Sequence, residues 1–577
     1  MVRSRMYDVA MPDLDPVNCA TCVPWENNFA QTYFANQSLV KSFSNYCAHL
    51  GNAPGMYQGV LDASNAAGAE SAFCMCDTEN WTPCESNVMK MIPEQINVQL
   101  ASSDTVVVSF VTFNIPYNTQ PVAVVSVSPS SEYNVSGVTH TYTSPTGNRV
   151  YYMHFVVLSR LEASQMYNVR VSAGGSAPIS DSFEFKAPHS SGLTRVAIFG
   201  DMGSYTWNNM GNMMDDIQND RIDAILHIGD HCYNLGGDDE KRGDAYMQQY
   251  QPLTTRVPWV PIIGNHEFYD GDELQRYLNQ SDGVVVAQEN HQSSLQNTHG
   301  GISTATSALG SLLSLSSFHS GGLHSGVPSN TSRFFSVDLG LIHFVALDLN
   351  MYNGVDTCGE DCRQAQLTWL NQDLSQVDRK ITPWIVAMAH FPLYCSNCPA
   401  PGKEPGVWWD SEYCEYVGHD KNCVVPEKFV EKTVRGANGL DNSMVVPDFE
   451  PIFMKYGVDI YASGHVHDYE WTYPIFNNTK IGKDFTNPQA PLHLVTGNGG
   501  PPSPSQFSSF QNWSYTHSTT DINADPNVFG SYTIMEAVNH REMKWTQISN
   551  GDGSVLDELV IVQLSHGEFP LPNVSSS

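Results

Sequence analysis

Six side chains of types that commonly bind metal ions stand shortly after short apolar runs of the chain. The runs span residues 195–199, 223–228, 257–263, 384–389 and 458–463. The side chains that follow them are Asp201, Asp230, Asn265, His390, His465 and His467. Runs of this length are typical of buried strands, and ligands of α/β folds gather where such strands end. A single Asp there is usually a turn residue, but five such endings predict one metal centre.

The elements that must position these side chains form an α/β pattern. From residue 194 onward the apolar runs alternate with helical stretches, for which residues 209–220 and 361–377 are examples. This alternation is typical of an α/β domain, which we place at residues 194–567. The later β-like runs, which we interpret as closing strands of the same domain, are 492–496, 532–535, 543–548 and 558–564.

One segment, residues 289–330, interrupts that pattern and is rich in Ser, Gly and His. A stretch of this length is either a functional lid or a disordered insertion, and we favour a mobile insertion. We expect His299, His319 and His324 inside it to be solvated rather than metal ligands.

Two segments precede the α/β domain. Residues 1–92 contain six cysteines and predict a disulfide-linked module of undetermined pairing. Residues 93–188 contain short strand-like runs separated by turn residues and no cysteine, which predicts an all-β, fibronectin-III-like sandwich with a structural role. Residues 187–193 form the linker to the α/β domain.

The charge balance restricts the partners. Among 577 residues, 60 acidic side chains stand against 28 basic ones, which gives a net charge of −32. Nucleic acids and anionic membrane surfaces both need a basic face, so they are not expected partners. If the substrate is a phosphate, bound metal ions must supply the local attraction. No run reaches the roughly 18 to 20 apolar residues of a membrane span.

Cysteine usage and glycosylation signals indicate an oxidising compartment. There are 13 cysteines, and Asn-x-Ser/Thr sequons occur at Asn36, Asn80, Asn134, Asn279, Asn330, Asn477, Asn512 and Asn573. We therefore expect a secreted, cell-surface, or vacuolar or lysosomal glycoprotein. Residues 1–20 lack the apolar core of a signal peptide, so either the numbering begins after a removed signal or the chain lacks one.

Cysteines beyond residue 92 allow several local bridges. Cys358 and Cys362 could form one, and two more could form among Cys395, Cys398, Cys414 and Cys423. If the first six pair among themselves, Cys232 remains as the odd cysteine. It is either a buried thiol or, less expected, an oxidisable or metal-perturbing one.

The order of the motifs resembles the purple acid phosphatases, within the wider metallophosphoesterase group. The motifs are Gly-Asp-x-Gly, Gly-Asp-x-x-Tyr, Gly-Asn-His-Glu, a strand that ends in His, and Gly-His-x-His. The resemblance extends over residues 93–567, since Pro93-Glu94-Gln95 is similar to the start of the family's N-terminal β domain. Residues 545–553 are similar to its closing segment.

The resemblance implies two metal sites. Asp201, Asp230, Tyr233 and His467 would bind one ion, and this oxygen-rich set suits Fe(III). Asn265, His390 and His465, with Asp230 shared, would bind a divalent ion such as Zn, Mn or Fe(II). The resemblance implies that Tyr233 separates this family from other metallophosphoesterases, because they have the Gly-Asp motif without this Tyr. A tyrosinate on Fe(III) gives the family its colour.

The implied reaction is hydrolysis of a phosphomonoester by a metal-activated hydroxide, without a covalent intermediate. Small phosphoesters are then the expected substrates, contacted by Asn265 and His266. His266 is the candidate to hold the phosphate or protonate the leaving alcohol, and the alternative is that it orients metal ligands. Glu267 could orient His266.

Other functions remain open from the sequence. One is a phosphodiesterase of the wider group, and another is a non-catalytic glycosylated surface or matrix protein that keeps the fold as a scaffold. Two departures from the family pattern bear on substrate preference. The final motif has Trp471 where relatives often have Arg, and His390 is followed by no further His until His419.

Overall fold

The computed structural model describes most of the chain from residue 89 onward. The described ranges are 21–24, 72–75, 89–288 with short gaps, 327–352, 359–395, 442–500, 514–519 and 530–570. The cysteine-rich module predicted for residues 1–92 falls almost wholly outside these ranges, apart from the paired strands β1 (Thr21–Pro24) and β2 (Ala72–Met75). The segment 289–330, His299, His319, His324 and His419 also lie outside the described residues, apart from residues 327–330.

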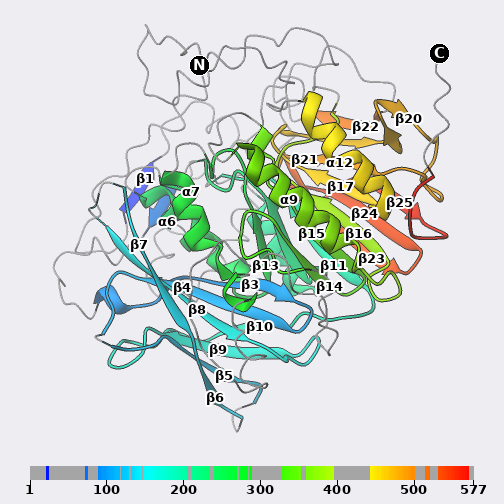
Figure 1. Ribbon diagram of the computed structural model, residues 1–577. Helices are drawn as coiled ribbons and strands as arrows, with labels where there is room; N and C mark the ends of the chain where they lie inside the picture. The colour runs from blue at the N-terminus through cyan, green and yellow to red at the C-terminus, as the bar shows by residue number, and fades with distance from the viewer. Residues whose placement is uncertain are drawn as a thin grey trace, which may run out of the picture.

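A ten-stranded sheet carries the first three motifs. Its order is β25-β24-β23-β11-β12-β13-β3-β4-β8-β7 (Figure 1). The catalytic strands in it are β11 (Thr194–Phe199), β12 (Ala224–Ile228), β13 (Trp259–Ile262), β23 (Ser531–Asn539), β24 (Glu542–Ser549) and β25 (Val555–Val562). β11, β12 and β13 are parallel neighbours, so their carboxyl ends meet at one edge.

A seven-stranded sheet carries the last two motifs. Its order is β14-β15-β16-β17-β21-β18-β22. The strands are β14 (Phe335–Leu339), β15 (Ile342–Ala346), β16 (Trp384–Met388), β17 (Ile460–Ser463), β18 (Asp468–Thr472), β21 (Leu492–Thr496) and β22 (Ser514–Thr519). The predicted closing strands are therefore present, with β21 in this sheet and β23 to β25 in the first.

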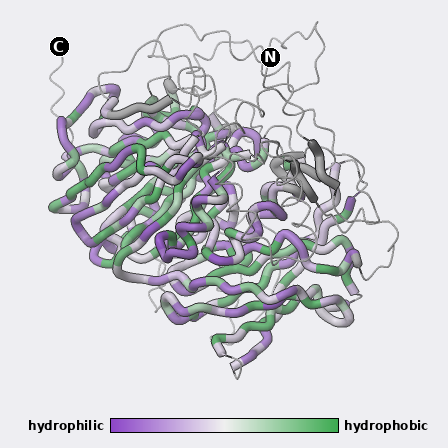
Figure 2. Tube along the Cα trace, turned by 180° about the vertical axis from the view of Figure 1, so that it is seen from behind, coloured by the Kyte–Doolittle hydropathy of each residue, from purple (hydrophilic) through white to green (hydrophobic). Residues whose placement is uncertain are grey.

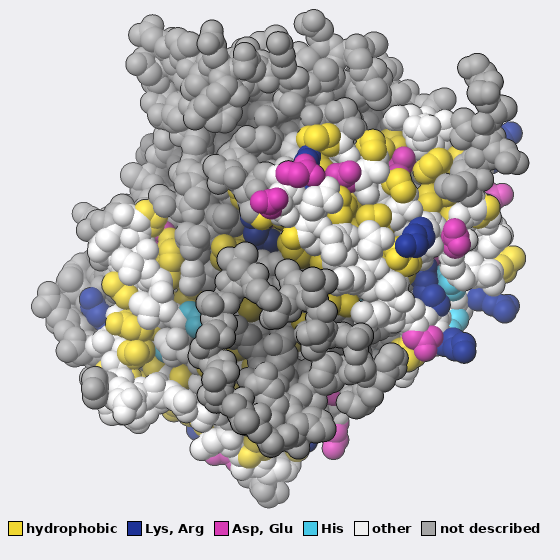
Figure 3. Space-filling view, viewed as in Figure 1, with side chains coloured by type: hydrophobic (Ala, Val, Ile, Leu, Met, Phe, Trp, Pro, Cys, Tyr) yellow, Lys and Arg dark blue, Asp and Glu magenta, His cyan; other side chains and the backbone are white. Residues whose placement is uncertain are grey.

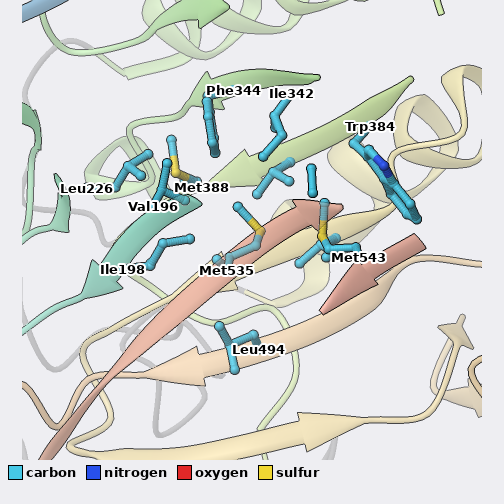
Figure 4. Close-up of a cluster of buried hydrophobic side chains, with 14 of the residues drawn as sticks. Val196, Ile198, Leu226, Ile342, Phe344, Trp384, Met388, Leu494, Met535 and Met543 are labelled. Atoms are coloured by element: carbon cyan, nitrogen blue, oxygen red, sulfur yellow. The ribbon is translucent and has the colours of Figure 1, made fainter. Parts of the chain in front are cut away.

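The two sheets pack face to face over one apolar core. Side chains from both sheets fill it, among them Val196 and Leu226 from the first sheet and Phe344 and Met388 from the second (Figure 4). Strands such as Ala224–Ile228 are buried at every position, which explains why the sequence shows continuous apolar runs rather than alternation. Burial on this scale holds the two sheets rigidly together.

Helices cover the outer faces of the two sheets. α5 (Met210–Gln218), α6 (Lys241–Thr254) and α7 (Asp272–Gln280) contribute to a second apolar cluster on the first sheet. α9 (Gly359–Leu374) and α12 (Asn442–Tyr456) lie over the second sheet (Figure 1). The helical stretches predicted at 209–220 and 361–377 correspond to α5 and α9. The smallest elements are η2 (Met89–Met91), η3 (Asn350–Tyr352), β19 (Ile475–Phe476) and β20 (Thr479–Lys480).

The N-terminal β domain is a two-sheet sandwich. One layer contains β3 (Glu94–Ser102), β4 (Thr105–Thr112), β8 (Val150–Leu158) and β7 (Val138–Thr143). The other contains β10 (Phe183–Lys186), β9 (Met166–Ser172), β5 (Val122–Ser126) and β6 (Tyr133–Ser136). β3 pairs with β13, so the first layer continues the catalytic sheet rather than merely packing beside it.

Hydropathy follows the strands, and the visible surface carries charges of both signs. Apolar stretches follow the strands in Figure 2. Within the coloured part of Figure 3, acidic and basic side chains are interspersed and form no continuous basic area. None of the helices that the structure describes combines the length and apolar character needed to cross a bilayer.

Candidate metal centre

The structure brings all seven predicted metal ligands to one place, at the carboxyl ends of five strands. Asp201 follows β11, Asp230 and Tyr233 follow β12, and Asn265 follows β13. His390 follows β16, and His465 and His467 follow β17. The centre therefore bridges both sheets, which share the apolar core below it.

The backbone at this edge adopts conformations that ordinary side chains avoid. Four of the ligands have positive φ angles, namely Asp201 (59°), Asp230 (53°), Tyr233 (55°) and His465 (64°). Such residues are held only where surrounding contacts over-determine them, and they cluster at functional sites. Gly229 is needed for a different reason, because a Cβ there would lie 2.6 Å from His390 Nδ1.

The ligand atoms fall into two groups that match the two predicted sets. In the first group, Tyr233 Oη lies 2.8 Å from His467 Nε2, which lies 3.1 Å from Asp201 Oδ1. In the second, Asn265 Oδ1 lies 2.8 Å from His390 Nε2 and 3.0 Å from His465 Nδ1.

Asp230 lies with the second group, which is adjacent to the first. Its Oδ1 atom lies 3.2 Å from His390 Nε2, and the ligand atoms of Asp230, His390 and His465 all lie within 4.8 Å of one another. His390 Nε2 in turn lies 4.0 Å from Asp201 Oδ1 of the first group. The two groups are therefore adjacent, as a site for two neighbouring cations requires.

A buried polar atom without a hydrogen bond supports a cation at this position. Asp201 is fully buried, and within the described part of the chain its Oδ1 has His467 Nε2 at 3.1 Å but makes no well-aligned hydrogen bond. Its Oδ2 accepts the N–H of His465 at 2.8 Å, which fixes the carboxylate. A buried carboxylate oxygen needs a partner, and the surrounding oxygen and nitrogen donors suit a metal ion.

Burial and the neighbouring charged groups shift the pKa values at the centre. Burial raises the pKa of Asp201 above its usual value, although His390 and His467 oppose the shift. Burial also raises the pKa of Asp230, but His390 and His266 reverse that effect and lower it below the usual value. Burial alone would lower the pKa of His390, but Asp230 and Asp201 raise it to about 9. The carboxylates and imidazoles of the centre therefore act on one another at close range.

His266 lies at the open side of the centre. Its side chain is 25% exposed, and Nε2 lies 3.7 Å from Asp230 Oδ2. Its ring packs edge-on against Tyr233, with 4.8 Å between the ring centroids. Its backbone N–H donates to Asp230 Oδ1 at 3.0 Å. The side chain is therefore available to a molecule that enters from solvent.

Glu267 has a different role from the one predicted. It is buried, and its carboxylate accepts the backbone N–H groups of Asp230, His231 and Gly264. Sequence reasoning missed this link because the loops that supply these groups are neighbours only in the folded sheet. The Glu267 carboxylate therefore holds two site loops together instead of orienting the His266 ring.

The sequence analysis connected Trp471 with substrate preference, but this residue lies away from the substrate side of the centre. It is fully buried between the sheets and packs edge-on against Trp545, with 4.7 Å between ring centroids. The departure at this position therefore bears on the core and not on substrate preference.

Sequence reasoning overlooked a sixth strand ending. Gly497 follows β21, and a Cβ at this position would lie 2.8 Å from Asp201 Oδ2. The Gly-Asn-Gly-Gly sequence after the apolar run 492–496 was the available signal. This ending supplies close backbone approach rather than a ligand.

The structure describes three of the cysteines beyond residue 92. Cys362 and Cys395 are disulfide-bonded, whereas Cys232 is a reduced, buried cysteine. The pairings predicted among Cys358, Cys398 and the later cysteines involve positions outside the described residues.

Three family models match successive parts of the chain. The calcineurin-like phosphoesterase model matches residues 194–469. The model for the purple acid phosphatase N-terminal domain matches residues 93–187, and that for the iron/zinc purple acid phosphatase-like protein C matches residues 490–558. The middle match contains all seven ligands.

Curated relatives and a solved structure agree with these matches. Acid phosphatase type 7 of Danio rerio is 25% identical over 439 residues, which cover 73% of this chain and 79% of the relative. Acid phosphatase type 7 of Mus musculus is 26% identical over 425 residues, covering 72% and 78%. Purple acid phosphatase 22 of Arabidopsis thaliana is 23% identical over 513 residues, covering 85% and 89%.

The structure of purple acid phosphatase PPD1 from yellow lupin (Lupinus luteus) seeds shares the fold. The TM-score is 0.57 at 20% identity, with 84% of this chain and 78% of that chain covered. The fold and the strand-end site thus define a calcineurin-like phosphoesterase domain. With its matching N-terminal and C-terminal parts, the chain belongs to the purple acid phosphatase family.

Proposed function

We propose that this protein is an acid phosphatase that hydrolyses small phosphomonoesters at a centre of two metal ions. The observation that carries the proposal is that the candidate ligand atoms form two adjacent groups, with Asp230 beside His390 and His390 in turn 4.0 Å from Asp201. The family matches and the acid phosphatase names of the relatives support it.

The chemistry of each ligand group favours a particular type of metal. Asp201, Asp230 and Tyr233 offer three oxygens beside His467, which favours Fe(III). Asn265, His390 and His465 offer one oxygen and two nitrogens beside Asp230, which favours Zn, Mn or Fe(II). When bound, such a pair polarises a phosphate, lowers the pKa of water and offsets the charge of the leaving oxygen.

The chain's own residues would then bind and orient the substrate. His266 is partly exposed beside Asp230, so its imidazole is placed to hold a phosphate oxygen or to donate a proton to the leaving alcohol. Its contact with Tyr233 and its backbone bond to Asp230 limit its movement. Asn265 adds an amide at the same edge.

A secretory or vacuolar location is part of the same proposal. Three of the eight sequons, at Asn134, Asn330 and Asn477, are exposed in the structure, as a glycosylation site requires. Cys362 and Cys395 in disulfides also suit an oxidising compartment. Glycosylation would be checked by a mobility shift after enzymatic removal of N-glycans.

The substrate class is tested by comparing p-nitrophenyl phosphate with bis(p-nitrophenyl) phosphate at acidic pH. We expect faster turnover of the monoester. Preference for the diester would instead identify a phosphodiesterase of the wider group. A metal-loaded protein with no turnover of either ester would favour a non-catalytic scaffold.

The role of His266 is tested by His266→Ala. We expect kcat to fall by about 10²- to 10⁴-fold, as general acid catalysis contributes, and the basic limb of the pH–rate profile to disappear. Metal content should stay unchanged. A loss of metal with normal activity per bound metal pair would show instead that His266 only orients ligands.

A further inference from the structure

Glu267 is a buried carboxylate that contacts backbone rather than substrate. Its Oε2 atom accepts the N–H of Asp230 at 2.8 Å and that of Gly264 at 2.9 Å. Its Oε1 atom accepts the N–H of His231 at 2.8 Å. Three backbone hydrogen bonds to one buried side chain are a strong local restraint.

These three N–H groups belong to the two loops that present Asp230 and Asn265. The strands before the loops, β12 and β13, pair in parallel as far as Ile228 and Ile262. Beyond that pair, Glu267 continues the connection between the two loops. The loops therefore do not depend on backbone pairing alone at the place where the ligands stand.

Hydrogen bonds link the two loops in both directions. Glu267 accepts the N–H of Asp230, and the Asp230 carboxylate accepts the N–H of His266, the residue just before Glu267. Asp230 also has a φ angle of 53°, which is unfavourable for a residue with a Cβ. A restraint on its N–H thus holds the shared ligand in a conformation that it would otherwise leave.

We infer that Glu267 is a positioning residue for the metal centre, which sets the distance between Asp230 and Asn265 through backbone hydrogen bonds. This inference rests on the proposed two-metal function. Glutamine would not replace it, because an amide has one acceptor oxygen and would turn N–H donors toward backbone N–H groups. Aspartate keeps both acceptor oxygens but is one carbon shorter, so it would restore the link in part.

The chain offers a matched control at the opposite end of the second sheet. Asp459 is buried, immediately precedes β17 and accepts the N–H of Ile385 at the start of β16 at 2.9 Å. It also pairs with Arg379 at 3.0 Å. Asp459→Asn therefore removes a buried carboxylate that links neighbouring strands, but at the edge away from the metal ligands.

The first test is a Zn²⁺ titration of the metal-free full-length protein. Glu267→Gln should bind Zn²⁺ about 10- to 100-fold more weakly, the usual effect of losing a group that orients ligands. Glu267→Asp should lie between it and the wild type, and Asp459→Asn should bind as the wild type does. Unchanged affinity in Glu267→Gln, or equal weakening in Asp459→Asn, would overturn the inference.

The second test is independent of metal. Hydrogen–deuterium exchange of the metal-free protein should become faster in residues 229–231 and 264–266 of Glu267→Gln, but not in Asp459→Asn. If Glu267→Gln does not fold, Glu267→Asp is measured and should show a smaller change of the same kind. Unchanged exchange in these loops would overturn the inference, whereas a wild-type protein that binds no metal would overturn the proposed function alone.

Discussion

Two fully buried aspartates, Asp201 in the metal centre and Asp244 on α6, differ in the cations around them. Burial raises the pKa of both. Arg149 and Arg276 reverse that effect for Asp244 and lower its pKa below the usual value, whereas the pKa of Asp201 stays raised. Among the described residues, no Arg or Lys pairs with Asp201.

The cluster around Asp244 shows what a structural charge cluster looks like in this protein. Asp244 accepts hydrogen bonds from Gln95 (2.8 Å), Arg149 (2.6 Å), Tyr151 (3.0 Å) and Arg276 (3.0 Å). It joins β3 and β8 of the N-terminal sandwich to α6 and α7. Here arginines face the carboxylate, whereas at the strand ends Asp201 and Asp230 face histidines, which are also metal-binding side chains.

The largest predicted effect is on the metal centre. Asp230→Asn removes the charge that both ligand groups share, so the protein should lose bound metal and phosphatase activity while keeping its fold. Metal analysis, an activity assay and circular dichroism would check this. Wild-type activity in a folded Asp230→Asn protein would show that the site is assigned wrongly.

The second effect should be on stability and not on metal binding. Asp244→Asn leaves two buried arginines without their main partner, and breaking such a pair costs roughly 3 to 5 kcal/mol of unfolding free energy. Urea unfolding of the metal-free protein measures it. Asp220→Asn is the control, because Asp220 is 67% exposed in its pair with Lys186 and should change stability by about 1 kcal/mol or less. Loss of metal without loss of stability in Asp244→Asn would contradict the distinction between a structural charge cluster at Asp244 and a metal centre at Asp201.

A third charge cluster, around His343, extends the comparison because its stabilising effect depends on pH. His343 is buried between Asp338 (2.6 Å) and Asp373 (3.0 Å). Burial lowers its pKa, but the two aspartates raise it to about 10. Its stabilisation is therefore complete below pH ~6.5 and is lost as the pH rises toward 10, by at most ~4 to 5 kcal/mol.

The pH effect is measured as the difference in unfolding free energy between the wild type and His343→Gln. The stabilising advantage of the wild type should shrink between pH 6.5 and 10. The same difference at every pH in this range would mean that His343 is not held protonated by its two partners.

The smallest predicted effect concerns Trp471 and tests whether this residue belongs to the core or to the active site. Trp471→Phe should reduce the unfolding free energy by about 1 to 3 kcal/mol, because Trp471 is buried between the sheets. The KM for p-nitrophenyl phosphate should not change. A changed KM together with wild-type stability would show that Trp471 affects substrate binding.

Local sequence was sufficient to predict the strands that the candidate ligands follow, whereas the assignment of each ligand came from the resemblance to the family. Each ligand, such as Asp201 or His390, directly follows a buried run, so its type and position are both visible in the sequence. The strand order within the sheets could not be predicted from local sequence, because the pairing of β3 with β13 depends on contacts between distant segments. The Glu267 connection and the core position of Trp471 depend on the same long-range packing, which spacing along the chain does not reveal.

The most direct test of the central claim is metal content together with visible absorption of the purified, unreduced protein. The account predicts iron plus a second metal, and a broad visible band that disappears in Tyr233→Phe. Two divalent ions without colour, after loss or reduction of iron has been excluded, would contradict an Fe(III) centre at Tyr233. No bound metal after reconstitution would contradict the metal centre itself.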